Sequence, residues 1–410
     1  MKCYNDRNNK KKILYIHHGK GLGGAPLSLL YLIKALDTTK YHPIVLLLHD
    51  SEIIDLYKKN NIEVYGPTNT YDFPHTKIWW FRWYHAPYLT RSIIDTVKTY
   101  FYTARSWLKL IKPDIVHLNT SSLIAWAAIA RKKNIPVIWH IREPLASGYF
   151  GLRKKLIISC VKKYSTAIVP ICHNDAQPWA HEAKTHVVYN AVDPVMFNFK
   201  PAQNSLQSNN NVGKNKTILF LGGLSQEKGT LVIFQAFEKL LTRMPEAQLL
   251  VAGYFDLPEL LEISQASGIK NFLPASRYKK IIYTIFNSIR HATVLLGPIT
   301  NVPAIMSKSN VIVFPATVGH FARPVIEAGF MKKPVIASSL PPLNELVIDG
   351  KTGFLVNSCH IDLWTDKLYE ILTNQVLANQ MGEQAYTYCL EKFSLEKHID
   401  AIEKIYSNKS

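Results

Sequence analysis

The chain of 410 residues carries 48 Lys and Arg against 30 Asp and Glu, a formal net charge of +18, and 47% of its residues are hydrophobic. This length predicts two or three domains, and the composition is ordinary for a globular protein with a sizeable core. The five cysteines are scattered, without a CxxC pair or metal-site spacing. This pattern excludes a disulfide framework and a zinc site, and it predicts reduced thiols.

Membrane-spanning and secretory segments are not evident. No stretch approaches the roughly 20 apolar residues of a spanning helix. The apolar run 13–16, after a basic N-terminus, is too short for a signal peptide. We therefore expect a cytoplasmic protein.

The excess positive charge belongs to one half of the chain. Residues 1–200 hold 28 Lys and Arg against 13 Asp and Glu, whereas residues 201–410 hold 20 against 17. Such a field attracts an anionic membrane, a nucleic acid or an anionic acceptor. A solvated basic surface that aids solubility is the alternative.

Short apolar runs alternate with helical stretches through the first half. The predicted strands are 13–16, 43–48, 63–65, 115–118, 137–140, 167–170 and 187–189, with a helix over 27–36 after the first of them. This alternation predicts a parallel sheet covered on both faces. The first strand and its helix are joined by a glycine-rich loop, in which the N–H groups of Gly23 and Gly24 can approach a ligand closely. A plain strand-to-helix turn would use the same residues.

Residues 75–112 are unusually aromatic and basic. They include Trp79, Trp80, Arg82 and Trp83. Trp prefers the bilayer interface and Arg favours anionic headgroups, so the segment predicts docking to a membrane surface. Core aromatic residues with snorkelling cations are the alternative.

A polar segment, 201–216, marks the join between two domains, because it cannot bury enough apolar surface to order itself. A second alternation follows, with strands predicted over 217–221, 249–253, 294–297, 311–315 and 334–337. The expected fold class is therefore α/β, with an N-terminal domain over 1–200 and a C-terminal domain over 201–393. The turn from Asn190 to Asp193 before the join is explained by its turn-forming residues alone.

Two loops at strand ends carry the chemistry of the second half. The run from Leu221 to Gly229 (LGGLSQEKG) places Lys228 beside glycine N–H groups, a combination that suits a diphosphate. A merely solvated lysine is disfavoured there by the helix dipole. The run from Gly319 to Ala328 (GHFARPVIEA) places Glu327 near a helix start, where a carboxylate can bond a ligand hydroxyl.

These motifs, with the later runs 333–337 (KPVIA) and 350–356 (GKTGFLV), resemble the nucleotide-sugar half of a retaining glycosyltransferase of family four, in the glycosyl transferases group 1. Further matches in the same order extend the resemblance over nearly the whole chain. It implies the GT-B fold of two facing Rossmann-like domains with a cleft between them. It also implies that a C-terminal helix, about 394–410, crosses back to the first domain.

The resemblance implies roles for individual residues. Glu327 would bond the donor ribose, and His140, at the end of a strand, would face the donor sugar and act in catalysis with Lys228. A structural histidine is the alternative for His140. Gly23 and Gly24 would face the donor phosphate and the acceptor. The full donor-binding set is Gly222, Gly223, Lys228, His320, Phe321, Ala322, Arg323 and Glu327. Lys228 and helix N-termini would neutralise the diphosphate, so no metal and no cofactor are expected.

Two glycines depart from the family pattern. Gly223 stands where the family usually has Arg, and Gly319 stands where it has the first of two Glu spaced eight residues apart. We expect either that Arg323 or another basic group supplies the missing charge or that donor binding is weak. The sugar contact of the missing Glu would be lost, or supplied by His320 or a backbone group. We also expect Arg142 and Glu143 to pair with each other or with the acceptor.

The sequence therefore predicts a hexosyltransferase that moves a sugar, with retention, from a nucleotide-sugar to a glycan or lipid-linked acceptor. The expected setting is bacterial cell-surface polysaccharide synthesis, with the protein on the inner face of the cell membrane. A weak or inactive GT-B protein that binds a nucleotide or glycan is the second hypothesis, motivated by the two glycines. No recognised motif supports nucleic-acid binding, and no such partner is expected.

Overall fold

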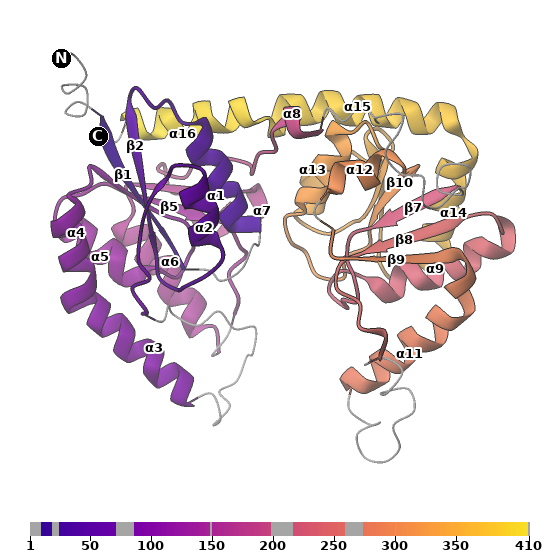
Figure 1. Cartoon of the computed structure of the whole chain (residues 1–410), viewed down its shortest axis with the longest axis horizontal. Coiled ribbons are helices and arrows are strands. Elements are labelled where there is room, and N and C mark those ends of the chain that lie inside the picture. The colour runs from indigo at the N-terminus through magenta and orange to yellow at the C-terminus, as the bar shows by residue number, and fades with distance from the viewer. Residues whose placement is uncertain are drawn as a thin grey trace. The chain divides into compact units, whose positions relative to one another are not determined.

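The computed structural model describes residues 10–18, 24–70, 86–147, 150–197, 216–258, 274–299 and 301–408. The chain divides into two compact units (Figure 1). Unit 1 comprises Met1–Ala191 and Leu395–Ser410, and unit 2 comprises Val192–Ser394. The division falls before the predicted join at 200/201, because the short helix α8 (Pro194–Phe197) packs against helix α13 (Arg323–Phe330) of unit 2.

Unit 1 contains a parallel sheet with strand order β3-β2-β1-β4-β5-β6. The strands are β1 (Lys11–His17), β2 (Tyr41–Leu47), β3 (Glu63–Tyr65), β4 (Ile115–Leu118), β5 (Val137–Ile141) and β6 (Ala167–Pro170). The helices are α1 (Gly24–Ala35), α2 (Ile53–Lys59), α3 (Ala86–Lys98), the π-helical turn η3 (Thr99–Thr103), α4 (Ala104–Ile111), α5 (Ile124–Lys132), α6 (Leu152–Tyr164), α7 (His173–Ala176), the 3₁₀ turn η4 (Gln177–Trp179) and α16 (Leu395–Asn408).

Both faces of this sheet are buried. Ile13 and Tyr15 of β1 pack in one cluster with side chains of α1, α2 and α16, and Leu14 and Ile16 pack in another with α4 and α5. Continuous apolar strands are typical of a parallel sheet covered on both sides. The last helix, α16, lies against α1 and belongs to unit 1, as the family resemblance implies.

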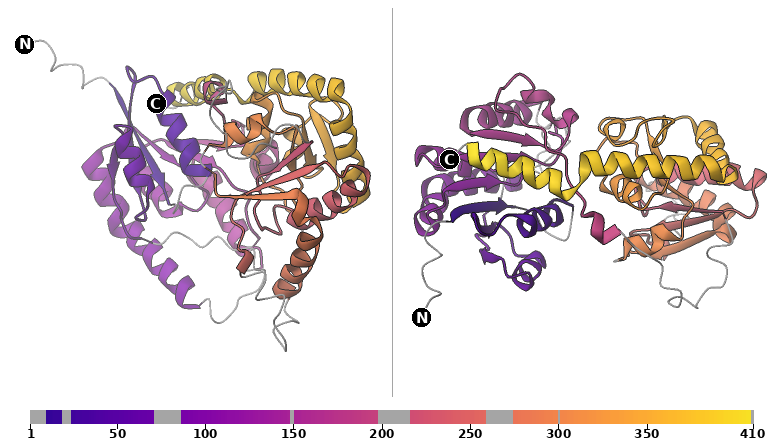
Figure 2. Two further views of the ribbon diagram at one scale, coloured as in Figure 1. Left: turned by 45° about the vertical axis from the view of Figure 1, so that its right-hand side comes forward. Right: turned by 90° about the horizontal axis from the view of Figure 1, so that it is seen from above.

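Unit 2 repeats this architecture, with strand order β12-β11-β10-β7-β8-β9 in a second parallel sheet (Figure 2). The strands are β7 (Thr217–Phe220), β8 (Gln248–Ala252), β9 (Thr293–Gly297), β10 (Val311–Phe314), β11 (Val335–Ser338) and β12 (Gly353–Val356). The helices are α9 (Thr230–Arg243), α11 (Pro274–Ile289), the 3₁₀ turn η6 (Arg290–Ala292), α12 (Val302–Ser307), α13, the 3₁₀ turn η7 (Leu343–Glu345), α14 (Ile361–Thr373) and α15 (Gln375–Phe393). Helices α9, α11 and α14 share one core cluster with the strands.

The predicted strands are formed except for 187–189, which is wrong. This segment runs beside β6, where the N–H groups of His186 and Val188 donate to the carbonyls of Ile168 and Pro170. These bonds do not form a strand ladder in the described structure, and the side chain of Asn190, which follows, bonds Arg142. None of the helices in the described ranges is both long and apolar enough to cross a membrane.

Candidate functional site

Two loops of unit 2 meet at the carboxyl ends of the neighbouring strands β7 and β10. The backbone N–H of Thr317 donates to the carbonyl of Glu227 (3.0 Å), and its hydroxyl donates to the carbonyl of Gln226 (2.8 Å). Gly229 has φ +84°, and a Cβ there would lie 1.7 Å from the Pro315 carbonyl oxygen, so this approach requires glycine. Loops at the carboxyl ends of strands are where α/β sheets bind ligands.

Lys228 and His320 touch across these loops. The Lys228 Nζ lies 2.8 Å from His320 Nε2 and 5.3 Å from the centre of the Phe314 ring. His320 Nδ1 lies 2.9 Å from the carbonyl oxygen of Val318. A carbonyl only accepts, so Nδ1 carries the hydrogen and Nε2 accepts from the ammonium group. Burial lowers the pKa of Lys228, and this neutral imidazole adds no positive charge beside it.

Arg323 and Glu327 form an ion pair across one turn of α13, the helix that follows the loop of His320. Arg323 is the first residue of α13, and Pro324 after it fits the first helical turn. The Arg323 Nε lies 2.7 Å from Glu327 Oε1, with side-chain exposures of 18% and 10%. Burial raises the pKa of Glu327, and the guanidinium partly opposes that rise. The segment from Val318 to Glu327 therefore holds both a cation and a carboxylate.

In unit 1, His140 stands at the end of a buried chain of polar side chains. His140 Nδ1 lies 3.1 Å from His117 Nε2, and His117 Nδ1 lies 2.6 Å from the hydroxyl of Tyr406. The Tyr406 hydroxyl lies 2.9 Å from that of Tyr15. Burial, with Arg142 adding to it, holds the pKa of both imidazoles well below the usual value. Both histidines are therefore neutral at pH 7.

Arg142 organises a second set of contacts at the same strand ends. Its Nε donates to Asn119 Oδ1 and its Nη1 donates to Asn190 Oδ1. With its oxygen facing Arg142, the Asn119 amide directs its NH₂ at His17 Nδ1, 3.2 Å away. Burial is the main cause that lowers the pKa of Arg142 to about 10, so it stays charged at pH 7.

Of the two alternatives expected for Arg142 and Glu143, pairing with each other is wrong, and pairing with the acceptor stays a prediction. Glu143 Oε1 instead accepts from the Thr120 hydroxyl (2.7 Å), the Ser121 hydroxyl (2.8 Å) and the Ser121 N–H (3.1 Å). Burial would raise the pKa of Glu143, but His18 and these three donors more than offset it and lower the pKa. These three donors already stabilise the charged carboxylate of Glu143, so it does not require the guanidinium group of Arg142.

Several buried nitrogens of this network have no hydrogen-bond partner among the described residues. They are His17 Nε2, His140 Nε2 and Arg142 Nη2. Buried polar groups are normally paired, so unmet ones at strand ends point to a missing ligand. Sequence analysis missed His17, His117 and Tyr406. The available signal was a histidine inside the otherwise apolar strand 115–118, since such a group must find a partner.

The two units match two models of glycosyltransferase families. Residues 22–195 match the model described as Glycosyltransferase Family 4, and residues 202–388 match Glycosyl transferases group 1. The chain belongs to the group 1 glycosyltransferases. Its two units, each built on one parallel sheet, are the two Rossmann-like domains of the GT-B fold.

Known relatives of this glycosyltransferase include two curated enzymes. N-acetyl-alpha-D-glucosaminyl L-malate synthase of Bacillus anthracis is 24% identical over 63% of this chain and 61% of its own. The Escherichia coli UDP-Gal:alpha-D-GlcNAc-diphosphoundecaprenol alpha-1,3-galactosyltransferase is 23% identical over 79% of this chain and 83% of its own. The chain spans less than two thirds of the length of several other curated relatives.

A solved structure with the same fold is HepE of Anabaena in complex with UDP. It superposes with a TM-score of 0.74 at 16% identity, covering 97% of this chain and all of the other. At that identity the likeness shows the fold alone.

At the two positions that depart from the family pattern, neighbouring backbone leaves no room for a side chain, so glycine is required. A Cβ on Gly319 would lie 1.9 Å from the carbonyl oxygen of Pro341. Gly223 has φ +55°, and its Cβ would lie 2.4 Å from the carbonyl oxygen of Tyr254. In this glycosyltransferase, neighbouring backbone therefore occupies the space that the usual Glu and Arg would need.

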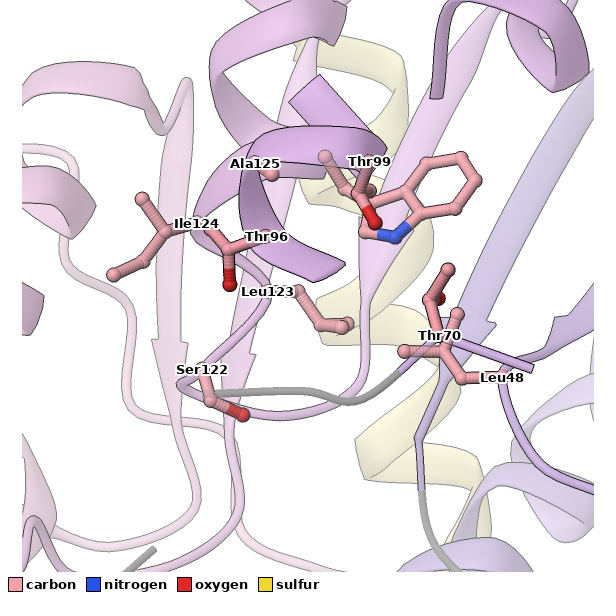
Figure 3. A pocket seen from close by; sticks show the side chains of 9 residues that line it. Leu48, Thr70, Thr96, Thr99, Ser122, Leu123, Ile124 and Ala125 are labelled. Atoms are coloured by element: carbon pink, nitrogen blue, oxygen red, sulfur yellow. The ribbon is translucent and has the colours of Figure 1, made fainter. Parts of the chain in front are cut away.

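A small pocket opens in unit 1 beside the carboxyl ends of β2 and β4 (Figure 3). Its hydroxyl groups come from Thr70, Thr96, Thr99 and Ser122, and its apolar part from Leu48, Leu123, Ile124, Ala125 and Trp126. Thr96 and Thr99 lie on α3 and η3. The pocket thus combines hydrogen-bonding groups with an apolar wall, as sites for small polar ligands do.

The remaining predicted site residues divide into described and undescribed ones. Gly23, Trp79, Trp80, Arg82 and Trp83 lie outside the described residues. Gly24 begins α1, and no atom of the described residues lies within 4 Å of where its Cβ would be. Gly222 has no such room, since its Cβ would lie 2.0 Å from the Phe220 ring. Ala322 is buried and precedes α13, and Phe321 lies beside it in the loop. Within the described ranges, no group of His, Cys, Asp and Glu could hold a metal ion.

Proposed function

We propose that this glycosyltransferase is a retaining, metal-independent hexosyltransferase that uses a nucleotide-sugar donor and a glycan or lipid-linked acceptor. One observation carries the proposal: His320, in the segment from Val318 to Glu327 of unit 2, contacts Lys228, and the same segment holds the carboxylate of Glu327 in an ion pair with Arg323. The ammonium group of Lys228 suits the negative charge of a diphosphate. The carboxylate of Glu327 can accept a hydrogen bond from a ribose hydroxyl. No organic cofactor enters this scheme.

Lys228 would stabilise the leaving group. The charge on the diphosphate grows as the glycosidic bond breaks, and a fixed ammonium group counters it without reorganisation. His320 holds that ammonium by accepting a hydrogen bond from it. The role of Mg²⁺ in other transferases would thus fall to Lys228, to Arg323 and to the N–H groups at the start of α9.

The names of relatives support the donor, the acceptor and the setting. HepE of Anabaena binds UDP, and the Escherichia coli relative is a transferase acting on a diphosphoundecaprenol glycan. We extend both features to this chain and place it in bacterial cell-surface polysaccharide synthesis at the inner face of the cell membrane. The extension is by similarity.

The test is release of nucleoside diphosphate from a panel of nucleotide-sugars. Candidate donors are first selected by thermal stabilisation of the protein, and release is then measured with polyprenyl-diphosphate glycan acceptors. We expect acceptor-dependent release that persists in excess EDTA, and a product with the anomeric configuration of the donor. Saturable binding without release on any acceptor would instead support a binding protein, the hypothesis that Gly223 and Gly319 motivate.

We further propose that unit 1 docks on an anionic membrane through the α3–α4 surface, the exposed side chains of α3, η3 and α4. Its exposed apolar residues are Tyr88, Ile93, Ile94, Val97, Phe101, Tyr102 and Leu110, with exposures from 48% to 71%. Its exposed basic residues are Arg91, Lys98, Arg105 and Lys109, and the exposed Lys112 follows directly after α4. A surface that is both apolar and basic is typical of interfacial binding.

Docking is tested by sedimentation with vesicles. We expect the wild-type protein to sediment with vesicles of anionic lipid at low salt and to be released at high salt, because screening weakens the ionic part. Ile94→Glu with Phe101→Glu should lower the bound fraction severalfold, since it puts charge into the apolar side. Val376→Glu, at an exposed position of α15, is the control and should bind normally. Equal binding to neutral and anionic vesicles would contradict the proposal.

A further inference from the structure

Helix α3 and the turn η3 bury hydroxyl groups and expose apolar side chains, the reverse of an ordinary surface helix. Ser92, Thr96 and Thr99 are spaced by four and three residues, so they share one face. Ser92 is fully buried and Thr99 is 4% exposed, whereas Ile93 and Ile94 on the outer side are 49% and 59% exposed. The inner face of this segment is therefore polar.

The hydroxyl groups of this inner face are not all paired within the protein. Thr96 donates to the carbonyl of Ser92 (2.7 Å), but the Ser92 hydroxyl has no partner among the described residues. The described residues also give no hydrogen-bond partner to the hydroxyl of Thr99, which lines the pocket of Figure 3. A buried hydroxyl group without a partner costs free energy, so an unpaired one in a pocket indicates a ligand with polar groups.

The start of α5 forms another wall of the same pocket. Leu123, the N-cap residue, and the first three helical residues, Ile124, Ala125 and Trp126, all line it. The N–H groups of a first helical turn have no acceptor inside their own helix, and no side chain caps this one. The pocket therefore offers N–H donors from α5 and hydroxyl groups from α3 and η3.

The surroundings of the pocket favour an uncharged ligand of the size of one ring. None of the described residues that line it carries a charge. The Glu143 carboxylate bonds the N–H of Ser121, next to the lining residue Ser122, and would repel an anion. The space measures about 250 Å³ with its open mouth, less than sites for drug-sized molecules have. A neutral sugar unit fits, because its hydroxyl groups can bond the polar walls and its C–H groups can pack on the apolar one.

The pocket and His140 lie on opposite faces of the sheet of unit 1. Leu123 and Trp126 belong to the core cluster that the sheet forms with α4 and α5. His140 bonds His117 and stacks on His398 of α16, the helix that covers the other face. A sugar unit in the pocket is therefore separate from a group bound at His140.

We propose that this pocket binds one neutral sugar unit of the acceptor that does not itself react, held by Thr96, Thr99 and the first turn of α5. The enzyme would thus select its acceptor by a sugar other than the one that receives the transferred group. The inference rests on the proposed function for the identity of the acceptor. Binding of a neutral sugar to the pocket does not depend on that function.

Binding is measured by NMR on protein labelled with ¹⁵N-tryptophan, with the Trp126 indole N–H as the reporter. The probes are the methyl glycosides of glucose, galactose and N-acetylglucosamine, and inorganic phosphate at equal concentration. We expect at least one glycoside to shift the Trp126 resonance saturably and phosphate to leave it unchanged. A shift with phosphate alone, or with no glycoside, would overturn the proposal.

Substitutions in and beside the pocket locate the bound glycoside. Thr99→Val keeps the shape of the side chain and removes only the hydroxyl group, so it should raise the Kd about fivefold. Ala125→Leu, which fills the pocket, should abolish the shift. Thr103→Val is the matched control and should not change the Kd, because Thr103 lies on the same turn η3 but does not line the pocket. Equal effects of Thr99→Val and Thr103→Val would refute the site, and the unfolding temperature shows that each variant is folded.

Kinetics separate this site from the reaction centre. Thr99→Val should raise the acceptor KM about fivefold and keep kcat and the donor KM within about twofold of wild type, as expected when a unit that does not react is bound less tightly. A lower kcat with an unchanged acceptor KM would contradict the proposal. If transfer occurs but no glycoside binds at Trp126, the inference fails and the proposed function stands. If a glycoside binds there but no acceptor supports transfer, the proposed function fails and the sugar site stands.

Discussion

Gly319→Ala is expected to destabilise unit 2 by about 3 kcal/mol or more, because its Cβ would lie 1.9 Å from the backbone oxygen of Pro341. Backbone on both sides must move to relieve such an overlap. For a unit of this size the loss corresponds to a fall in Tm of about 10 °C. Calorimetry or thermal unfolding followed by circular dichroism measures it.

Gly350→Ala is the control for a glycine replacement in the same unit. Gly350 has φ +70° with open space around its Cβ, so only backbone strain of about 1 kcal/mol is expected. Gly319→Glu, which introduces the carboxylate usual in the family, should be as unstable as Gly319→Ala and should not improve transfer. A stable Gly319→Glu variant with raised activity would show that the site was merely lacking a carboxylate.

Lys228→Ala is expected to lower kcat/KM for the nucleotide-sugar by about 100-fold, the usual cost of removing one group that stabilises developing charge. The fold should tolerate the change, because the side chain is only partly buried and its hydrogen bond is to the His320 side chain. Steady-state release of nucleoside diphosphate gives the rate, and the unfolding temperature shows that the protein remains folded.

Lys239→Ala is the matched control for this loss of charge. Lys239 lies on α9, the helix that follows Lys228, and pairs at the surface with Asp362. Its removal should change kcat/KM less than twofold. If Lys239→Ala and Lys228→Ala reduce the rate equally, the effect is one of overall charge and the assignment of Lys228 to the diphosphate is wrong.

Much of the fold followed from sequence, because strands in a parallel sheet are buried on both faces and appear as short apolar runs. Val311–Phe314 and Ile115–Leu118 are such runs, and both are strands. The segment 187–189 is a similar apolar run, but it makes only an edge contact with the end of β6. Apolar composition alone does not distinguish such a contact from a strand. The contact of α8 with α13 could not be read from the sequence, because nothing in the residues of α8 indicates the helix it packs against.

That the two motifs of unit 2 meet could be predicted, since each is compact and follows a strand of one parallel sheet. His320 was expected to replace a missing carboxylate; the structure adds that it accepts a hydrogen bond from Lys228. The network of unit 1 was not predictable. Tyr15, His117 and Tyr406 come from distant parts of the chain, and only the returning helix brings Tyr406 to His117, a separation in sequence of 289 residues.

Calorimetric titration measures whether unit 2 binds a nucleoside diphosphate through Lys228 and Glu327. UDP, ADP and GDP would be titrated in EDTA into the wild-type protein, Lys228→Ala, Glu327→Ala and Lys239→Ala. We predict saturable binding of one nucleotide, a Kd raised about tenfold or more by each of the first two substitutions, and no change for Lys239→Ala. Binding that is equally strong in all four proteins, or absent from the wild-type protein for every nucleotide, would show that Lys228 and Glu327 do not form a nucleoside diphosphate site.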